Sequence, residues 1–453
     1  MTCISDVDQW ARCQWHAVEL GDARLERRVV EVGARMAAMP GASLPQQMGD
    51  WASLKAAYRM LNHPEVSHTK LSEPHWCTTR QEAREMPVTL LVQDMTYLDY
   101  TLYRDTMAGL GPIGDGGGQG LLLHTTLAVV PAPRRVLGIA HQHVFVRVPV
   151  PPGESRRRRP KRERETRVWG EAIQAIGAPP QGSHWVLIAD RAADNTDLLL
   201  TCRRTGTDFN VRMAFEHRLV TEDRTPTYLL TTARSWLPVV GKTLDLPAAN
   251  GRAARLAHLL VSLGRVQLRT PKSEAPLWVW VVRTWEVDAP SDVKPVEWIL
   301  ATSVAVETAE DALQRLDWYT ARWVVEEYHQ CLKTGCQIER RDFEHADRVK
   351  RLLGFLAPTA LRLLQMREEA RLNPDLPASV VAEPITIAVL AAKLEAPAAT
   401  LTVRSFWRGV ARLGGFLGRS RDGEPGWKTI WRGWQILDML TQGANLMASL
   451  SKT

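Results

Sequence analysis

The chain has 453 residues and a mass of 50.8 kDa, more than one hydrophobic core of ordinary size, so two to four domains are expected. A hydrophobic content of 45% excludes a disordered protein, and the net charge of +7 suits a polyanionic partner, although proteins that bind no nucleic acid can be as basic. The apolar runs are shorter than a membrane span, and the sequence does not open with a secretory signal, so we expect neither a membrane protein nor a secreted one.

The first 70 residues are predicted to be helical and basic. Residues 20–39 and 51–62 carry apolar side chains at helical spacing with basic ones between them. A solvated helical surface is the plain interpretation, and a DNA-reading domain is the sharper one. The basic residues that matter for the second interpretation are Arg24, Arg28, Lys55 and Arg59.

Residues 87–149 change to strand patterns. The apolar run 87–93 ends at Asp94, and two further strands are predicted at 121–130 and 136–148. The Gly-rich stretch 109–120 is predicted to be a flexible loop. It lacks the strand-to-helix setting of a phosphate-binding loop, so nucleotide binding is not expected there.

The rest of the chain alternates between predicted loops, strands and helices. Residues 150–167 are rich in Pro and Arg and predict an exposed loop, and 184–190 form an apolar strand that ends in Asp190. Residues 206–303 are mostly strand-like, and 306–370 are helical. The remainder holds helical segments broken by Pro and Gly, with a packing stripe of tryptophans. These tryptophans are Trp427, Trp431 and Trp434.

The six cysteines show no pairing typical of a zinc site. Cys331 and Cys336 are five residues apart, with no histidine at zinc-finger spacing. We therefore expect no structural zinc and reduced thiols, which indicates a cytoplasmic protein.

Asp94 and Asp190 stand in the same local setting, at the end of an apolar strand. A buried strand does not readily hold an internal carboxylate, whereas its end can open onto a cleft. If the two strands are neighbours, the two carboxylates converge. Each is weak alone, because Asp is also a common turn residue.

The segment 317–335 is more informative. On one continuous helix its four polar residues would fall within about 60° of one another, beside an apolar stripe. The polar residues are Tyr319, Arg322, Glu326 and Lys333, and the stripe is Trp318, Ala321, Val325, Tyr328 and Leu332. Taken alone, this pattern favours the plain interpretation of Arg322 and Glu326 as an ordinary i,i+4 ion pair on a solvated helix.

Together with the two aspartates, Glu326 completes a set of three acids that can hold two divalent cations. Oxygen ligands without Cys or His favour Mg²⁺ or Mn²⁺ over zinc. Such a pair activates a water or 3′-hydroxyl and steadies the leaving oxygen, and Tyr319, Arg322 and Lys333 then suit the neighbouring phosphates.

The spacing Tyr-x2-Arg-x3-Glu-x6-Lys in residues 319–333 resembles the signature of the insertion-sequence-four family of DDE transposases. The similarity runs nearly end to end and is looser at the N-terminus. The stretches that carry it are LGDARLERR, LKAAYRMLNHPEV, QDMTYLDY, IADRAADN and VARLGGFLGRSRDGEPGWKTIWRGW. Ala192 stands where the pattern has Glu, which the metal chemistry does not require.

The resemblance implies a multidomain α/β protein. Residues 1–70 would be a helical domain that binds DNA ends, 71–370 a ribonuclease H-like core with a β-rich insertion at about 206–303, and 371–453 a helical dimerisation domain. The implied activity is cut-and-paste transposition with two Mg²⁺ (or Mn²⁺) ions: a nick, a hairpin, its hydrolysis and strand transfer.

The resemblance also implies roles for single residues. Asp94, Asp190 and Glu326 would be the catalytic metal ligands. Tyr319, Arg322 and Lys333 would hold phosphates at the hairpin, Trp298 would stack on a flipped base beside Arg212, and Arg28, with Arg24, Lys55 and Arg59, would contact end DNA. Alternatively, Trp298 is a core tryptophan and Arg212 a strand-edge charge.

Double-stranded DNA, both transposon end and target, and a second copy of the chain in a synaptic homodimer are the implied partners, at the bacterial nucleoid in the cytoplasm. Two alternatives remain. One is a related nuclease or resolvase that does not join strands, and the other is an inactive DNA-binding derivative.

Overall fold

The computed structural model describes residues 6–147, 165–222, 225–246, 255–291, 293–419 and 423–450. Most of the Pro- and Arg-rich stretch predicted as an exposed loop lies outside these ranges. No described helix is both long and apolar enough to cross a membrane.

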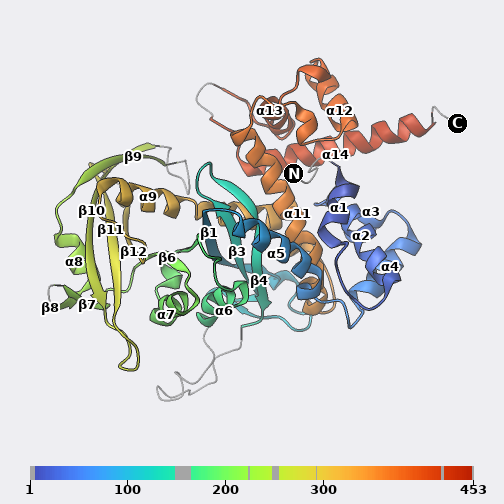
Figure 1. Ribbon diagram of the computed structural model, residues 1–453. Helices are drawn as coiled ribbons and strands as arrows, with labels where there is room; N and C mark the ends of the chain where they lie inside the picture. The colour runs from blue at the N-terminus through green and yellow to red at the C-terminus, as the bar shows by residue number, and fades with distance from the viewer. Residues whose placement is uncertain are drawn as a thin grey trace.

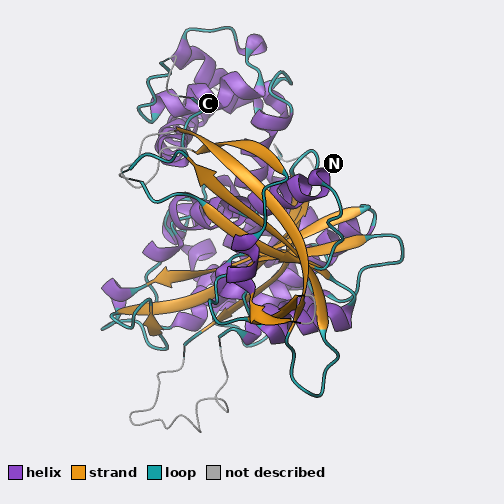
Figure 2. Ribbon diagram, turned by 90° about the vertical axis from the view of Figure 1, so that its left-hand side faces the viewer, coloured by secondary structure: helices purple, strands orange, loops and turns teal. Residues whose placement is uncertain are grey.

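A twelve-stranded mixed sheet runs through the molecule, with helices on both sides (Figure 2). Its strands are β1 (Val88–Asp99), β2 (Gly111–Ile113), β3 (Gly118–Val130), β4 (Arg135–Phe145), β5 (His184–Ala189), β6 (Asp208–Arg212), β7 (Leu219–Glu222), β8 (Thr225–Tyr228), β9 (Val240–Leu246), β10 (Arg255–Leu268), β11 (Leu277–Val287) and β12 (Glu297–Thr302). The strands predicted at 121–130, 136–148 and 184–190 are confirmed.

The sheet has two halves that meet where β12 pairs with β6. In the first half the order is β4-β3-β1-β5-β6, with β5 parallel to both β1 and β6, and β3 antiparallel to β1 and β4. The second half is antiparallel and contains β12, β11, β10, β9, β7 and β8. The block 206–303 is strand-rich, as predicted, but β6 continues the parallel pairing of the first half, so the added strands begin only after it.

Fourteen α-helices of the described residues surround this sheet (Figure 1). They are α1 (Val7–Trp15), α2 (Ala23–Ala38), α3 (Leu44–Met48), α4 (Trp51–Leu61), α5 (His68–Arg84), α6 (Arg167–Ile176), α7 (Thr196–Thr205), α8 (Leu229–Ser235), α9 (Ala309–Thr320), α10 (Trp323–Gln330), α11 (Ala346–Leu372), α12 (Pro384–Leu394), α13 (Val403–Leu413) and α14 (Trp427–Leu450). The helices predicted at 20–39 and 51–62 correspond to α2 and α4.

The helices form layers and end groups. Helices α6 and α7 lie on one face of the first half of the sheet, and α10 and α11 on the other. The N-terminal helices α1 to α4 and the C-terminal helices α12 to α14 lie beyond the central sheet, and α11 contacts both groups (Figure 1). In the C-terminal group Trp427 and Trp431 are buried and stacked, with ring centroids 5.5 Å apart, which confirms the predicted packing stripe.

The Gly-rich stretch 109–120 is not the loop that was predicted. It forms strand β2, a turn, and the start of β3, which pairs with β1. Glycine is required at two points of this hairpin. Gly116 has φ 102°, a conformation that side chains disfavour, and a Cβ on Gly120 would lie 2.0 Å from the Leu98 carbonyl oxygen. The glycines therefore permit close strand packing beside the end of β1.

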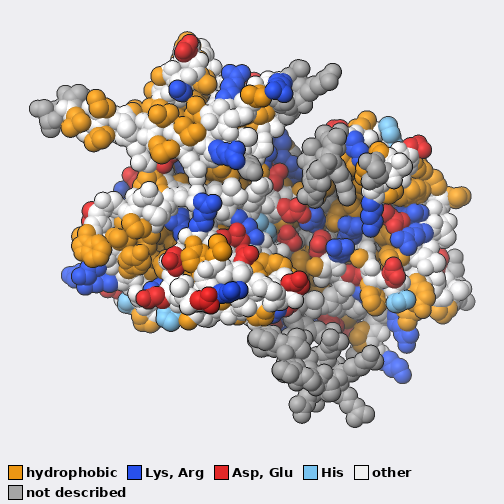
Figure 3. Space-filling view, turned by 180° about the vertical axis from the view of Figure 1, so that it is seen from behind, with side chains coloured by type: hydrophobic (Ala, Val, Ile, Leu, Met, Phe, Trp, Pro, Cys, Tyr) orange, Lys and Arg blue, Asp and Glu red, His pale blue; other side chains and the backbone are white. Residues whose placement is uncertain are grey.

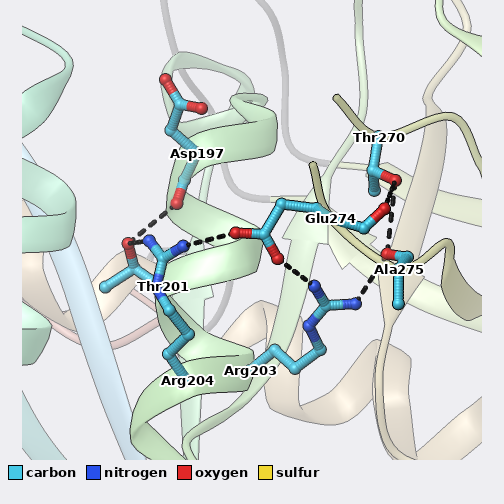
Figure 4. A network of polar contacts seen from close by, with 7 residues as sticks. All are labelled: Asp197, Thr201, Arg203, Arg204, Thr270, Glu274 and Ala275. Carbon is cyan, nitrogen blue, oxygen red and sulfur yellow. Dashed lines mark hydrogen bonds and ion pairs between the residues drawn. The ribbon is translucent and has the colours of Figure 1, made fainter. Parts of the chain in front are cut away.

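The turn between β10 and β11 is tied to helix α7 (Figure 4). Glu274 accepts from Arg203 at 2.6 Å and from Arg204 at 3.1 Å, and Arg203 also donates to the carbonyl oxygen of Ala275 at 2.9 Å. Exposed ion pairs contribute little stability singly, but this bidentate set fixes the far end of the antiparallel half against the central core.

A partly buried histidine joins the N-terminal helices to the sheet. The Nδ1 atom of His75 on α5 lies 2.8 Å from the Gln14 side-chain oxygen, and its Nε2 atom accepts from the Ile139 amide at 3.1 Å. This arrangement requires the neutral ring, and burial lowers the pKa of His75 to about 4. Burial likewise lowers the pKa values of His68 and His141 to about 4.

We expect acid to destabilise the fold through these histidines. A histidine whose folded pKa is depressed binds more protons when unfolded, so the free energy of unfolding falls as pH drops from 6.5 toward 4. His75→Gln should remove roughly 1 to 2 kcal/mol of that loss. Denaturant unfolding at pH 7.5 and pH 5 measures it, with the exposed His16→Gln as the matched control. Equal acid sensitivity in both variants would contradict the assignment.

Candidate active site

The first two acidic residues lie where two parallel strands separate. Strands β1 and β5 pair from Val88 to Val92, and β5 ends at Ala189, just before Asp190. The prediction that this strand ends at Asp94 is wrong. Strand β1 continues to Asp99, because β3 still pairs with it there. Asp94 therefore lies just beyond the last pair of β1 with β5, where β1 is still paired with β3.

Asp190 starts a tight turn at this point. Its Oδ1 atom accepts from the Ala192 amide at 2.8 Å, which caps the short 3-10 turn Arg191–Ala193. This is the turn role that aspartate often has after a strand. It leaves the second carboxylate oxygen free of a hydrogen bond from any described residue.

Asp94 is an unusual carboxyl group. Its side chain is 20% exposed, and burial raises its pKa to about 7. The charge of Arg322 lowers this pKa, whereas the charges of Asp190 and Glu326 raise it. The three predicted acids are thus close enough to influence one another, and their mutual repulsion adds to the cost of burial.

The segment predicted as one helix is broken. Helix α9 ends at Thr320, a turn covers Ala321 and Arg322, α10 begins at Trp323, and the residues Cys331–Gly335 form a π-helical turn. The predicted apolar stripe is nevertheless buried throughout. The break places Tyr319, Arg322, Glu326 and Lys333 on four successive structural pieces instead of on one straight helix.

Arg322 and Glu326 form the i,i+4 pair that the plain interpretation expects, with Nη1 and Oε1 2.6 Å apart. The pair is not a simple surface pair, because the Arg322 side chain is only 12% exposed while that of Glu326 is 53% exposed. Burial lowers the pKa of Arg322, but Glu326, Tyr319 and Asp94 raise it more, so the net pKa is raised. The guanidinium therefore pairs with Glu326 and also lowers the pKa of Asp94, although the net pKa of Asp94 stays raised.

Lys333 is held by a different carboxylate. Its Nζ atom lies 3.1 Å from Oε1 of Glu339, which also accepts from the Asp99 amide at 3.0 Å. This arrangement links the π-helical turn to the far end of β1. The lysine remains partly exposed at this position.

Trp298 lies in an aromatic cluster at the edge of the site. It is 9% exposed, and its ring centroid is 5.2 Å from that of Tyr319 and 6.3 Å from that of Trp323. Arg212 donates to the Glu297 carbonyl oxygen at 3.0 Å. Burial raises the pKa of Tyr319, and the charge of Arg212 offsets part of that rise. Trp298 is thus packed as the core tryptophan of the plain interpretation, although it lies next to the predicted phosphate-binding tyrosine.

The four basic residues of the N-terminal part lie on other elements. Arg24 and Arg28 are on α2, and Lys55 and Arg59 are on α4. Arg24, Lys55 and Arg59 are exposed and Arg28 is half-buried. They do not belong to the group around Asp94.

Three regions of the chain match known families. Residues 7–66 match the transposase DNA-binding domain, residues 158–361 the transposase DDE domain, and residues 359–453 the Tn5 transposase dimerisation domain. The chain is a Tn5-like DDE transposase. It is therefore a metal-dependent enzyme that acts on DNA, and its partners are DNA and a second copy of itself. Its mixed α/β core with helical N- and C-terminal regions is consistent with this family.

His329 lies beside Asp94 and was not predicted from the sequence. His329 lies three residues after Glu326 on α10, with Nδ1 3.8 Å from Oδ2 of Asp94 and Nε2 3.2 Å from Oγ1 of Thr125. Burial lowers its pKa to about 3, so the ring is neutral and adds no positive charge. The sequence offered one indication of this position, because residues three apart on a helix lie on the same face, so His329 could be expected beside Glu326.

The three acids fit a divalent cation chemically. Oxygen ligands are what Mg²⁺ and Mn²⁺ prefer, and a bound cation would offset the burial and the neighbouring negative charges that raise the pKa of Asp94. No group of three or more His, Cys, Asp or Glu side chains among the described residues is already arranged to hold a metal ion. The Glu326 carboxylate is turned to Arg322, and it would have to leave that partner to join the aspartates.

Proposed function

We propose that this transposase moves DNA by a cut-and-paste reaction. It nicks the transposon end, the freed 3′-hydroxyl attacks the opposite strand to form a hairpin, the hairpin is hydrolysed, and the 3′-hydroxyl end joins target DNA. The observation that carries the proposal is the grouping of Asp190, Glu326 and Arg322 around the buried carboxyl group of Asp94, with Arg322 paired to Glu326.

A ribonuclease H-like core is proposed for the catalytic part. The strand order β4-β3-β1-β5-β6, with β3 antiparallel to its neighbours, supports it, because this order brings the ends of β1 and β5 together at the centre of the sheet. The proposed domains are a DNA-end-binding domain at 1–70, a core at 71–370 with the β-rich insertion at about 206–303, and a dimerisation domain at 371–453.

Asp94, Asp190 and Glu326 would hold two Mg²⁺ or Mn²⁺ ions. When bound, these ions supply a more acidic water or 3′-hydroxyl and stabilise charge on the leaving oxygen. The chain itself neutralises and orients the DNA: Arg322 and Lys333 bind phosphates next to the scissile bond. In the DNA-free chain Arg322 is paired with Glu326 and Lys333 with Glu339. A DNA phosphate would therefore replace one of these carboxylates as the partner of the basic side chain.

The aromatic cluster would receive the unpaired base of the hairpin. Tyr319 would bind the adjacent phosphate and Arg212 the flipped nucleotide, while Trp298 would stack on the base. Trp298 is largely covered by Tyr319 and Trp323, so this role requires the cluster to open when DNA binds. In the synaptic homodimer Arg24, Arg28, Lys55 and Arg59 would contact the transposon end.

The decisive test uses the purified protein, duplex DNA carrying the inverted repeats that flank its gene, and Mg²⁺. We expect a nick, then a hairpin, then products joined to a target plasmid, and no product when the metal is chelated. Absence of any nick or hairpin with Mg²⁺ or Mn²⁺ would contradict the proposal. Cleavage without joining, even from pre-cleaved ends, would instead identify a nuclease.

A further inference from the structure

The N-terminal helices contain a tight helix–turn–helix unit. Helix α3 ends at Met48, Gly49 adopts φ 78°, and Asp50 caps α4 by accepting from the Ser53 amide at 2.9 Å. Two helices joined by a short glycine-containing turn are the framework in which a second helix is presented to the DNA major groove. Residues 7–66, which match the transposase DNA-binding domain, include this whole unit.

Helix α4 has one buried and one open face. Ala57, Met60 and Leu61 are buried, whereas Trp51, Lys55, Tyr58 and Arg59 are exposed on the opposite side. At about 100° per residue Trp51, Lys55 and Tyr58 fall within about 60° of one another, with Arg59 next to them. The open face therefore combines two aromatic and two cationic side chains.

Trp51 is the exceptional member of this face. It is 75% exposed, although tryptophan is one of the side chains most strongly stabilised by burial. Among the described residues neither Lys55 nor Arg59 is ion-paired. Asp50, which precedes the helix, lies 3.6 Å from Arg35, so its charge is offset. A second acid, Asp342, lines a hollow beside Tyr58.

The open face also leads toward the catalytic part of the chain. Tyr58 lines a hollow of about 390 Å³ together with Gln46, Arg340 and Arg341. Arg341 donates to the carbonyl oxygens of Pro40 at 3.0 Å and Cys336 at 2.9 Å, which joins the loop before α3 to the π-helical turn that contains Lys333. DNA that runs along α4 would thus meet Arg340 on its way to the active site.

On the face seen from behind, the charges of the described residues do not by themselves identify a DNA path. Seen from behind, basic and acidic side chains of the described residues are interspersed over the surface (Figure 3). Sequence-independent contact with phosphates needs only such dispersed cations, but reading of bases needs side chains that reach the groove floor.

We propose that α4 is the base-reading helix of this transposase and that Trp51 contacts the 5-methyl group of a thymine in the major groove of the transposon end. Apolar contact with that methyl group is how an apolar side chain distinguishes thymine, and the N-terminal residues of a reading helix are those that reach base edges. Lys55 and Arg59 hold the flanking phosphates. The inference rests on the proposed function for its choice of DNA.

The test measures binding without cleavage, using the full chain in the absence of divalent metal. The preferred sequence is first selected from a random duplex library, and each thymine of the selected duplex is then replaced by uracil, which removes only the methyl group. For wild type we expect about fourfold weaker binding at one position. Trp51→Ala should bind the parent duplex about fourfold more weakly and show no further loss with uracil.

Two variants serve as controls. Leu237→Ala removes another highly exposed apolar side chain, far along the chain, and should respond to uracil as wild type does. Lys55→Ala should weaken binding to all duplexes alike and reduce the salt dependence by about one phosphate contact. Circular dichroism checks that each variant is folded, and Trp51→Tyr should keep part of the response to the methyl group.

The proposal is overturned if wild type selects no sequence, or if Trp51→Ala retains the full response to uracil. It is also overturned if Trp51→Ala leaves DNA binding unchanged but weakens self-association in sedimentation, because Trp51 would then be a subunit contact. A protein that passes this binding test and still cuts no DNA with Mg²⁺ would refute the proposed activity and leave the role of α4 standing.

Discussion

Asp94→Asn is expected to abolish DNA cleavage and at the same time to stabilise the folded protein. The pKa of Asp94 is raised from its ordinary value to about 7 by burial and by the nearby charges of Asp190 and Glu326. A carboxyl group of this kind binds more protons when folded, so it costs stability increasingly as pH rises from about 4 to about 7, and the full cost persists above that. An uncharged amide of the same shape removes this cost.

At pH 8 the gain in unfolding free energy should approach but not exceed about 4 kcal/mol, the equivalent of a three-unit pKa shift. At pH 4 it should nearly vanish. Cleavage should fall on the order of 10³-fold or more, because one of the three carboxylates that we propose as metal ligands is lost. Stability and catalysis are thus opposed at this residue, as they are at many active sites.

Mg²⁺ provides a readout that does not depend on activity. Added at pH 8, it should raise the melting temperature of wild type, because it neutralises the repelling carboxylates, and should have a much smaller effect on Asp94→Asn. Asp105→Asn, at a position 90% exposed, is the matched control and should respond as wild type does. An Asp94→Asn variant that is less stable than wild type at pH 8, or equally sensitive to Mg²⁺, would contradict the assignment.

The strands and their acids were predictable because burial leaves a strong local pattern. Short apolar runs such as 87–93 and 184–189 favour buried strands, and a carboxylate follows each run. The sequence did not reveal that β1 continues beyond Asp94. That extension depends on pairing with β3, between residues that are 21 to 29 positions apart in the sequence, and such pairing leaves no periodic signal nearby.

The third acid was located correctly on a helix, but the helix is not straight. The turn at Ala321 and Arg322 contains no proline or glycine, so no local breaker marked it. It lies where Tyr319 and Trp323 both pack against Trp298, and that packing is tertiary. The Gly-rich hairpin was missed for a related reason, since glycines needed for close strand contact resemble glycines of a loop.

The last consequence concerns Arg322, which lies next to two of the three acids. In the DNA-free chain it pairs with Glu326 and is the strongest charge that lowers the pKa of Asp94. It therefore occupies electrostatically the place that divalent cations would take. If DNA phosphates draw Arg322 away, Glu326 becomes free to bind metal at the moment when substrate is present.

Arg322→Ala should consequently bind metal more tightly and cut DNA less. Loss of one positive charge beside three carboxylates is expected to lower, by about tenfold, the Mg²⁺ concentration that gives half of the melting-temperature rise. Cleavage should fall by at least about 10²-fold, because the phosphate loses its buried cation. Arg322→Lys, which keeps the charge but not the planar fork, should lie between wild type and Arg322→Ala in both measurements.

Arg367→Ala is the matched control, because Arg367 on α11 pairs at 3.0 Å with Glu327, the residue that follows Glu326 on α10. It removes an arginine–glutamate pair without touching Asp94, so its response to Mg²⁺ should equal that of wild type. If Arg322→Ala needed more Mg²⁺ than wild type, Arg322 would be supporting the metal ligands and not competing with the ions. The arginine of the signature would then act only as a scaffold for Glu326, and the exchange between phosphate and carboxylate would have to be abandoned.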